Sequence, residues 1–135
     1  MKKEKSCGAI VINNNNEILL VKTVKGFFGF PKGHVENDET EQETAIREVK
    51  EETNIDIEII SDKRFVFSYK VDGVIDKDVI FFIAKPISNN LKSQESEITE
   101  SKWVDINIVE SYFDFDNIKK LWNNEIKPEV ISIKE

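Results

Sequence analysis

Hydrophobic residues are concentrated in short runs separated by polar turns, a pattern that favours β-strands. Residues 6–12 (SCGAIVI) and 17–22 (EILLVK) flank a run of asparagines and predict two strands joined by a hairpin. Residues 26–34 (GFFGFPKGH) contain glycines and a proline, which favour a short strand running into an irregular loop. Four more strands are predicted, at residues 55–60, 63–71, 78–85 and 101–106.

Helical spacing of hydrophobic residues begins only after residue 40. Thr40 followed by Glu43 is a capping-box pattern, so a helix is predicted to start near Glu41. Asn54 is predicted to end this helix, because asparagine adopts the left-handed conformation found at helix ends. The predicted buried stripe consists of Ala45, Ile46, Val49 and Thr53.

Two more helices are predicted near the carboxyl end, a short one at residues 107–113 and a longer amphipathic one at residues 116–126. The predicted inward-facing residues of the longer helix are Ile118, Leu121 and Trp122. Strands and helices are thus mixed along the chain, and no linker composition divides it. We therefore predict a single domain over residues 1–135, of the mixed α/β class, with helices covering a sheet.

Composition restricts the classes of function. The chain has 135 residues, of which 39% are hydrophobic and 33% charged, as in a soluble globular protein. Its net charge of −7 repels long nucleic acids and anionic membranes, so neither is an expected partner. No apolar run approaches the roughly 20 residues that span a bilayer. The single cysteine, Cys7, suits a reducing compartment and a buried position, so we expect a cytoplasmic protein.

Three glutamates are crowded on the predicted central helix. Glu48, Glu51 and Glu52 have i, i+3, i+4 spacing, which brings like charges together on one face. Such a carboxylate patch suits a hard cation, either magnesium or manganese. The alternative is a solvated acidic face, on which Glu43 pairs with Arg47.

The loop before this helix favours the metal site. Gly33, Glu39 and residues 47–55 (REVKEETNI) have the spacing of the Nudix box, so the chain resembles the Nudix hydrolase family. The resemblance implies a mixed β-sheet sandwiched between helices and a metal-dependent hydrolase. One box position differs, because Asn54 stands where the family has glycine. Asparagine is the residue best able to replace glycine at positive φ, so we expect a small loss of stability and no change in chemistry.

The resemblance also implies roles for the box residues. Glu48 and Glu52 would bind Mg²⁺, with Mn²⁺ as the alternative, and the Gly33 carbonyl would be a further ligand. Glu51 would be an additional ligand or the base that activates water, and Glu52 is the other candidate for the base. Glu39 and Arg47 would form a salt bridge between the loop and the helix.

The flanks of the box resemble asymmetric diadenosine tetraphosphate hydrolases within that family. Lys32 and His34, on either side of the box glycine, would contact phosphates, and Tyr69 would stack on a nucleobase; a core-packed Tyr69 is the alternative. Glu97 would be a metal ligand from outside the box. Glu95 and Glu100 are alternatives to Glu97, and Lys22, Lys25 and Lys77 are further cationic candidates.

The function expected from this resemblance is hydrolysis of diadenosine tetraphosphate to ATP and AMP by an activated water. The alternatives within the family are oxidised nucleotides, RNA 5′ ends and inositol pyrophosphates. A binding module that has lost catalysis is the alternative from another class, although Glu48, Glu51 and Glu52 are all present. The expected partner is a small nucleotide, and the sequence does not define the oligomeric state.

Overall fold

A computed structural model describes residues 3–92 and 98–134 of the chain. Its strands are β1 (Lys3–Val11), β2 (Glu17–Thr23), β3 (Phe28–Gly29), β4 (Lys32–His34), β5 (Ile57–Ile59), β6 (Phe65–Val71), β7 (Ile75–Pro86) and β8 (Ile98–Asp105). Its helical elements are α1 (Glu41–Thr53), the 3₁₀ turn η1 (Val109–Tyr112), α2 (Asp116–Leu121), the π-helical turn η2 (Trp122–Ile126) and α3 (Lys127–Lys134).

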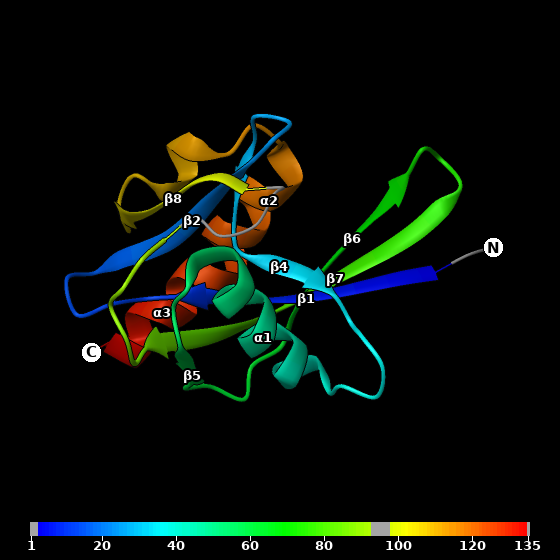
Figure 1. The fold of residues 1–135 in the computed structure, drawn as a ribbon. Helices are drawn as coiled ribbons and strands as arrows, with labels where there is room; N and C mark the ends of the chain where they lie inside the picture. The colour runs from blue at the N-terminus through cyan, green and yellow to red at the C-terminus, as the bar shows by residue number, and fades with distance from the viewer. Residues whose placement is uncertain (1–2, 93–97, 135) are drawn as a thin grey trace.

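The strands form two sheets. A five-stranded mixed sheet has the order β4-β1-β7-β5, and β6 also pairs with β7. Within it, β1 and β7 are parallel, whereas β4, β5 and β6 pair antiparallel with their neighbours. A smaller antiparallel sheet has the order β3-β2-β8. The β6–β7 hairpin projects beyond the rest of the larger sheet, together with the start of β1 (Figure 1).

The predicted hairpin between the first two strands is wrong. The two strands β1 and β2 belong to different sheets and meet only at a bridge between Ile12 and Ile18. The reason is that both edges of β1 are taken, by β4 and by the parallel partner β7, whereas β2 pairs with β8. Sequence proximity therefore predicted the turn correctly but the pairing incorrectly.

The box helix α1 begins and ends as predicted. The Thr40 hydroxyl accepts from the Glu43 amide (3.1 Å), and the Glu43 carboxylate accepts from the Thr40 amide (2.8 Å), which completes the capping box. Asn54 ends the helix in the left-handed conformation with φ 66°. One residue of the predicted stripe is wrong, because Ile46 is 40% exposed and Thr44 is buried instead.

The larger sheet is covered on both faces, which confirms the predicted mixed α/β class (Figure 1). On β1, Ala9 and Val11 face α1 and pack with Val49. The alternate residue Ile10 faces the other side, in a cluster that contains the fully buried Trp122 of the carboxyl-terminal segment. Cys7 is buried beneath α1, as predicted, and burial raises the pKa of its thiol to about 11. Across residues 3–92 and 98–134, no helix has the length and apolarity needed to cross a membrane.

Candidate active site

Gly33 and Glu48 form the contact that joins the box loop to the box helix. Gly33 lies on β4, beside α1, and a β-carbon built on it would overlap the Glu48 carboxylate. Only a glycine therefore leaves room for this carboxylate against the β4 backbone. The Glu48 side chain is 12% exposed, so its carboxylate lies in a partly dehydrated position.

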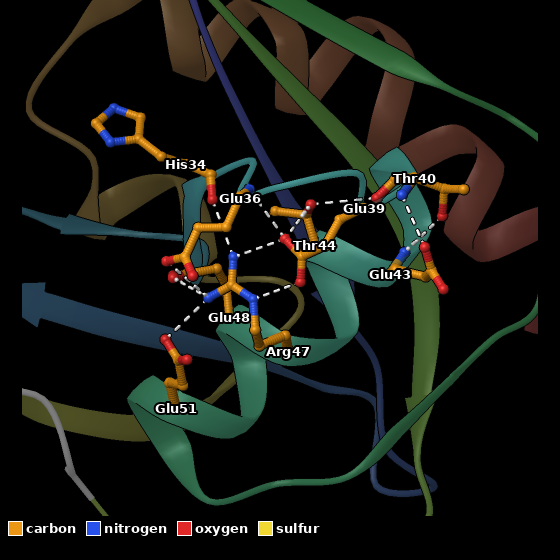
Figure 2. A network of polar contacts seen from close by, with 9 residues as sticks. All are labelled: His34, Glu36, Glu39, Thr40, Glu43, Thr44, Arg47, Glu48 and Glu51. Carbon is orange, nitrogen blue, oxygen red and sulfur yellow. Dashed lines mark hydrogen bonds and ion pairs between the residues drawn. The ribbon is translucent and has the colours of Figure 1, made fainter.

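Arg47 is the centre of a polar network on the same side of α1 (Figure 2). Its Nε donates to Glu39 Oε2 (2.6 Å) and its Nη2 to Glu39 Oε1 (2.9 Å), which confirms the predicted salt bridge. The hydrogen bond from Arg47 lowers the pKa of Glu39 to about 2. Nη2 also donates to the His34 carbonyl (3.0 Å), so Arg47 ties the loop to the helix. Glu43 caps the helix instead of pairing with Arg47.

Two of the three clustered glutamates are bound to Arg47. Its Nη1 donates to Glu48 Oε1 and to Glu51 Oε2, both at 3.1 Å (Figure 2). Burial raises the pKa of Glu48 to about 7, the charge of Glu51 adds to this rise, and Arg47 opposes it. The arginine thus offsets the repulsion that the spacing of these carboxylates produces.

The third glutamate points elsewhere. Glu52 Oε1 accepts a hydrogen bond from the Lys32 amide (3.2 Å), and both residues line a cavity beside α1. With these orientations, no three His, Cys, Asp or Glu side chains within residues 3–92 and 98–134 are grouped closely enough to hold a metal ion. Glu51 or Glu52 has to change rotamer before three carboxylates share one cation.

The donor set itself fits a hard cation. Glu48, Glu51 and Glu52 offer carboxylate oxygens, and Gly33, in contact with the Glu48 carboxylate, adds a backbone carbonyl. Oxygen ligands of this kind suit Mg²⁺ or Mn²⁺ and give no advantage to softer metals. The metal roles of these residues remain predictions.

The cavity next to Glu52 has a volume of about 610 Å³. It lies between the two sheets, and its lining is mostly apolar. Seven of the lining side chains are aromatic: Phe27, Phe28, Phe30, Phe67, Tyr69, Phe81 and Phe115. Lys32, Glu52, Lys25, Thr23 and Asn117 are its main polar residues. Binding pockets commonly combine such an apolar lining with a few polar groups at defined positions.

Tyr69 lies in this cavity, on the projecting strand β6. Its ring packs against that of Phe67 in a tilted arrangement, with centroids 5.3 Å apart and an interplanar angle of 45°. Burial, followed by the charge of Glu4, raises the pKa of its hydroxyl. Phe27 and Phe115 also line the cavity; they are 42% and 53% exposed, and their ring centroids are 5.0 Å apart. The cavity therefore contains two separate aromatic pairs, Phe67 with Tyr69 and Phe27 with Phe115.

The remaining predicted residues are dispersed. His34 does not line the cavity; its ring is 62% exposed and its Nε2 lies 3.6 Å from Glu4 Oε2. Lys25 lines the cavity, the Lys22 ammonium lies 5.6 Å from the centroid of the Phe28 ring, and Lys77 borders a smaller cavity beside Tyr69.

The predicted ligand outside the box cannot be located. Glu97, and the alternative Glu95, lie outside the described residues. The other alternative, Glu100, lies on β8, 3.4 Å from the Lys102 ammonium. The assignment of Glu97 therefore stays a prediction.

Sequence reasoning missed the other aromatic residues that line the cavity with Tyr69. Phe27 and Phe28 belong to the run GFFGF, whose density of aromatic residues beside the box was the available signal. Phe115 and Asn117 come from the start of α2, far along the chain, and no local pattern connects them with the box.

Known proteins with the same features define the class. A NUDIX domain model matches residues 2–125. Nudix hydrolase 2 of Arabidopsis thaliana is 37% identical over 105 residues, which cover 72% of this chain and 37% of the plant protein. An RNA pyrophosphohydrolase of Pelagibacter ubique (strain HTCC1062) is 28% identical over 127 residues, 80% of each chain. The crystal structure of a C. elegans Ap4A hydrolase binary complex matches with a TM-score of 0.82 and 25% identity, covering 98% of this chain and 99% of that one.

The chain belongs to the NUDIX domain family, as the box predicted. The structural match over nearly the full length confirms the predicted fold. The chain spans between about a quarter and two fifths of the length of the Arabidopsis relatives that it matches.

Proposed function

We propose that this protein is a metal-dependent hydrolase of nucleotide phosphoanhydrides, with diadenosine tetraphosphate as its substrate and ATP and AMP as products. One observation carries the proposal: an aromatic cavity of about 610 Å³, the right size for a nucleoside, has Glu52 of the box helix and Lys32 of the box loop in its wall. The structural likeness to a C. elegans Ap4A hydrolase supports this choice of substrate.

The residues proposed to hold Mg²⁺, or Mn²⁺, are Gly33 through its carbonyl, Glu48, Glu51, Glu52 and Glu97. When bound, the metal supplies positive charge that stabilises charge developing on the phosphoryl oxygens. Glu51 or Glu52 accepts the proton of the attacking water. The Glu51 and Glu52 carboxylates can reach the proposed metal position by a change of side-chain rotamer. The Glu48 carboxylate, by contrast, is packed against Gly33.

Three further residues are proposed to bind substrate. Tyr69 stacks on one nucleobase, because an aromatic face binds a base whatever its edge. Lys32 lies in the same wall and supplies positive charge to the phosphates. His34 reaches the phosphates only if its exposed ring turns away from Glu4. The proposed partner is a small nucleotide. The proposed location is the reducing cytoplasm, because the one cysteine is buried and forms no disulfide.

A second candidate substrate is an RNA 5′ end. It is favoured by the Pelagibacter relative, an RNA pyrophosphohydrolase that matches over 80% of both chains. Lys22 and Lys102 also flank the Phe28 ring, with their ammonium groups 5.6 and 5.2 Å from its centroid, which is a suitable surface for a nucleotide chain. The net charge of −7 opposes long nucleic acids, so we rank this substrate second.

Product analysis tests the proposal. The protein is incubated with Mg²⁺ and diadenosine tetraphosphate, triphosphate-ended RNA, an oxidised nucleotide or an inositol pyrophosphate, and the products are separated by chromatography. We expect ATP and AMP from the first substrate, abolished in Glu52→Gln and retained in Glu58→Gln, an exposed glutamate paired with Lys85 on β7. Turnover of another substrate alone would refute the assignment of diadenosine tetraphosphate as the substrate. Absence of turnover with all four substrates would refute the assignment as a hydrolase.

A further inference from the structure

The guanidinium of Arg47 uses all of its hydrogen-bond donors. An arginine has five N–H groups. Nε and Nη2 donate to the two oxygens of Glu39, and Nη2 also donates to the His34 carbonyl. The two N–H groups of Nη1 are taken by Glu48 and Glu51.

Glu36 is a further carboxylate beside this saturated group. Its Oε2 lies 3.6 Å from Arg47 Nη1, beyond hydrogen-bond distance, and its side chain is 59% exposed (Figure 2). The backbone of Glu36 is fixed, because its amide donates to Glu39 Oε1 (3.0 Å). The carboxylate is therefore held next to a nitrogen that has no N–H left to give it.

Metal binding would change this balance. Arg47 Nη1 holds Glu48 through Oε1 and Glu51 through Oε2. Glu48 can offer its second oxygen to a cation while it stays bound to Nη1, whereas a Glu51 side chain that changes rotamer to reach the same cation is lost to Nη1. The Arg47 side chain is only 22% exposed, so an N–H released there is poorly solvated and costs free energy. A replacement acceptor within a small side-chain movement removes that cost.

We propose that Glu36 is this replacement: it is a positioning residue that takes over the N–H of Arg47 Nη1 that is released when Glu51 turns to the metal. The inference rests on the metal site of the proposed function and gives Glu36 a role that the Nudix box does not assign to it. Glu36 thereby strengthens metal binding without touching the metal.

Binding of Mn²⁺ to the full chain without substrate tests the proposal, with free Mn²⁺ measured by electron paramagnetic resonance. We expect Glu36→Gln to raise the Kd for Mn²⁺ about fivefold, the size of one charged hydrogen bond near the surface. Asp38→Asn is the matched control, because this exposed residue of the same loop carries the same charge, and its Kd should change less than about twofold.

A double-mutant cycle identifies the route of the effect. Lysine at position 47 has no planar fork with which to hold Glu39 and offer a second nitrogen to Glu36. In the Arg47→Lys background, Glu36→Gln should therefore change the Kd less than about twofold. A persistent fivefold change would mean that Glu36 acts on the metal directly and would overturn the proposal.

Two other results would also overturn it. Equal changes of Kd in Glu36→Gln and Asp38→Asn would mean that the effect comes from the loss of one negative charge anywhere in this loop. Absence of Mn²⁺ binding by the unmodified protein would mean that there is no metal site for Glu36 to support. The expected Kd pattern without hydrolysis of diadenosine tetraphosphate would instead refute the proposed substrate and support the role of Glu36.

Discussion

Gly8 and Gly33 lie in neighbouring strands. Comparing alanine variants at the two positions separates the effect of the Gly33–Glu48 contact on metal binding from its effect on stability. Gly33 has no positive φ, so the backbone accepts alanine there and the cost is steric. The overlapping atoms belong to the end of the Glu48 side chain, which is able to move. We expect Gly33→Ala to lower the free energy of unfolding by only about 1 kcal/mol, the low end for overpacking.

Gly8 provides the matched comparison. A β-carbon on Gly8 would meet the Pro31 carbonyl oxygen and the Cα and Cβ of Lys32, which are backbone or close to it. Moving the Pro31 carbonyl also disturbs its hydrogen bond from the Ala9 amide (3.3 Å). We expect Gly8→Ala to lower the free energy of unfolding by about 3 kcal/mol, or roughly 10 °C in Tm for a domain of this size.

For metal binding we expect the reverse order: Gly33→Ala should weaken it more than Gly8→Ala. Gly33→Ala displaces the Glu48 carboxylate, a proposed ligand, so we expect its Kd for Mn²⁺ to rise about tenfold or more. Urea unfolding and Mn²⁺ titration of both variants measure the two effects. A Gly33→Ala protein that binds Mn²⁺ with unchanged Kd would refute the assignment of Glu48 to the metal, whatever its stability.

Three further predictions use other parts of the structure. Tyr69→Leu should raise KM for diadenosine tetraphosphate about tenfold, whereas Tyr69→Phe should leave it unchanged, because stacking needs the ring and not the hydroxyl. Equal KM values for the leucine and phenylalanine variants would exclude stacking. Glu39 has its pKa lowered from 4.5 to about 2, so its contribution to stability is present above pH 4.5 and is lost as the pH falls from 4.5 towards 2. Urea unfolding over this range should therefore show a weaker pH dependence in Glu39→Gln than in the unmodified protein, and an identical dependence would contradict the pairing with Arg47. Asn54 has φ 66°, so Asn54→Ala should lower the free energy of unfolding by about 1 kcal/mol. Asn54→Gly should be nearly neutral, because glycine accepts this φ more easily but loses the hydrogen bond to the Asn90 carbonyl. Turnover should be unchanged in both variants.

The local elements of the fold were largely predictable. The capping box of Thr40 and Glu43 and the left-handed Asn54 are local signals, and they marked the ends of α1 correctly. Pairing was less predictable, because the partner of β1 is the parallel strand β7, more than sixty residues later. Helical spacing places Ile46 in the predicted buried stripe, but Ile46 is exposed and Thr44 is buried instead. Burial of the polar Thr44 is possible because its hydroxyl donates to Glu39 and to the Thr40 carbonyl.

The site was predictable where chemistry is encoded in spacing, and less so where it depends on distant segments. The box spacing predicted that Glu48, Glu51 and Glu52 share one face; Glu48 and Glu51 meet at Arg47, whereas Glu52 points to the cavity, and their metal roles stay predictions. The family resemblance predicted the pairing of Glu39 with Arg47, which the structure confirms. The aromatic residues of the cavity come from β3 and its flanks, β6, β7 and the residue before α2, so they come together only after the sheets have assembled.

Arg47 explains how α1 tolerates its crowded carboxylates. Its position places it next to Glu48 in sequence and one helical turn before Glu51, so a single guanidinium reaches both while keeping Glu39. The repulsion that makes such a helix unfavourable is therefore offset inside the box, before any cation binds. In the proposed metal complex the arginine would compete with the cation for Glu51, and the acceptor at Glu36, 3.6 Å from Nη1, would then have an effect that the number of ligands alone does not predict.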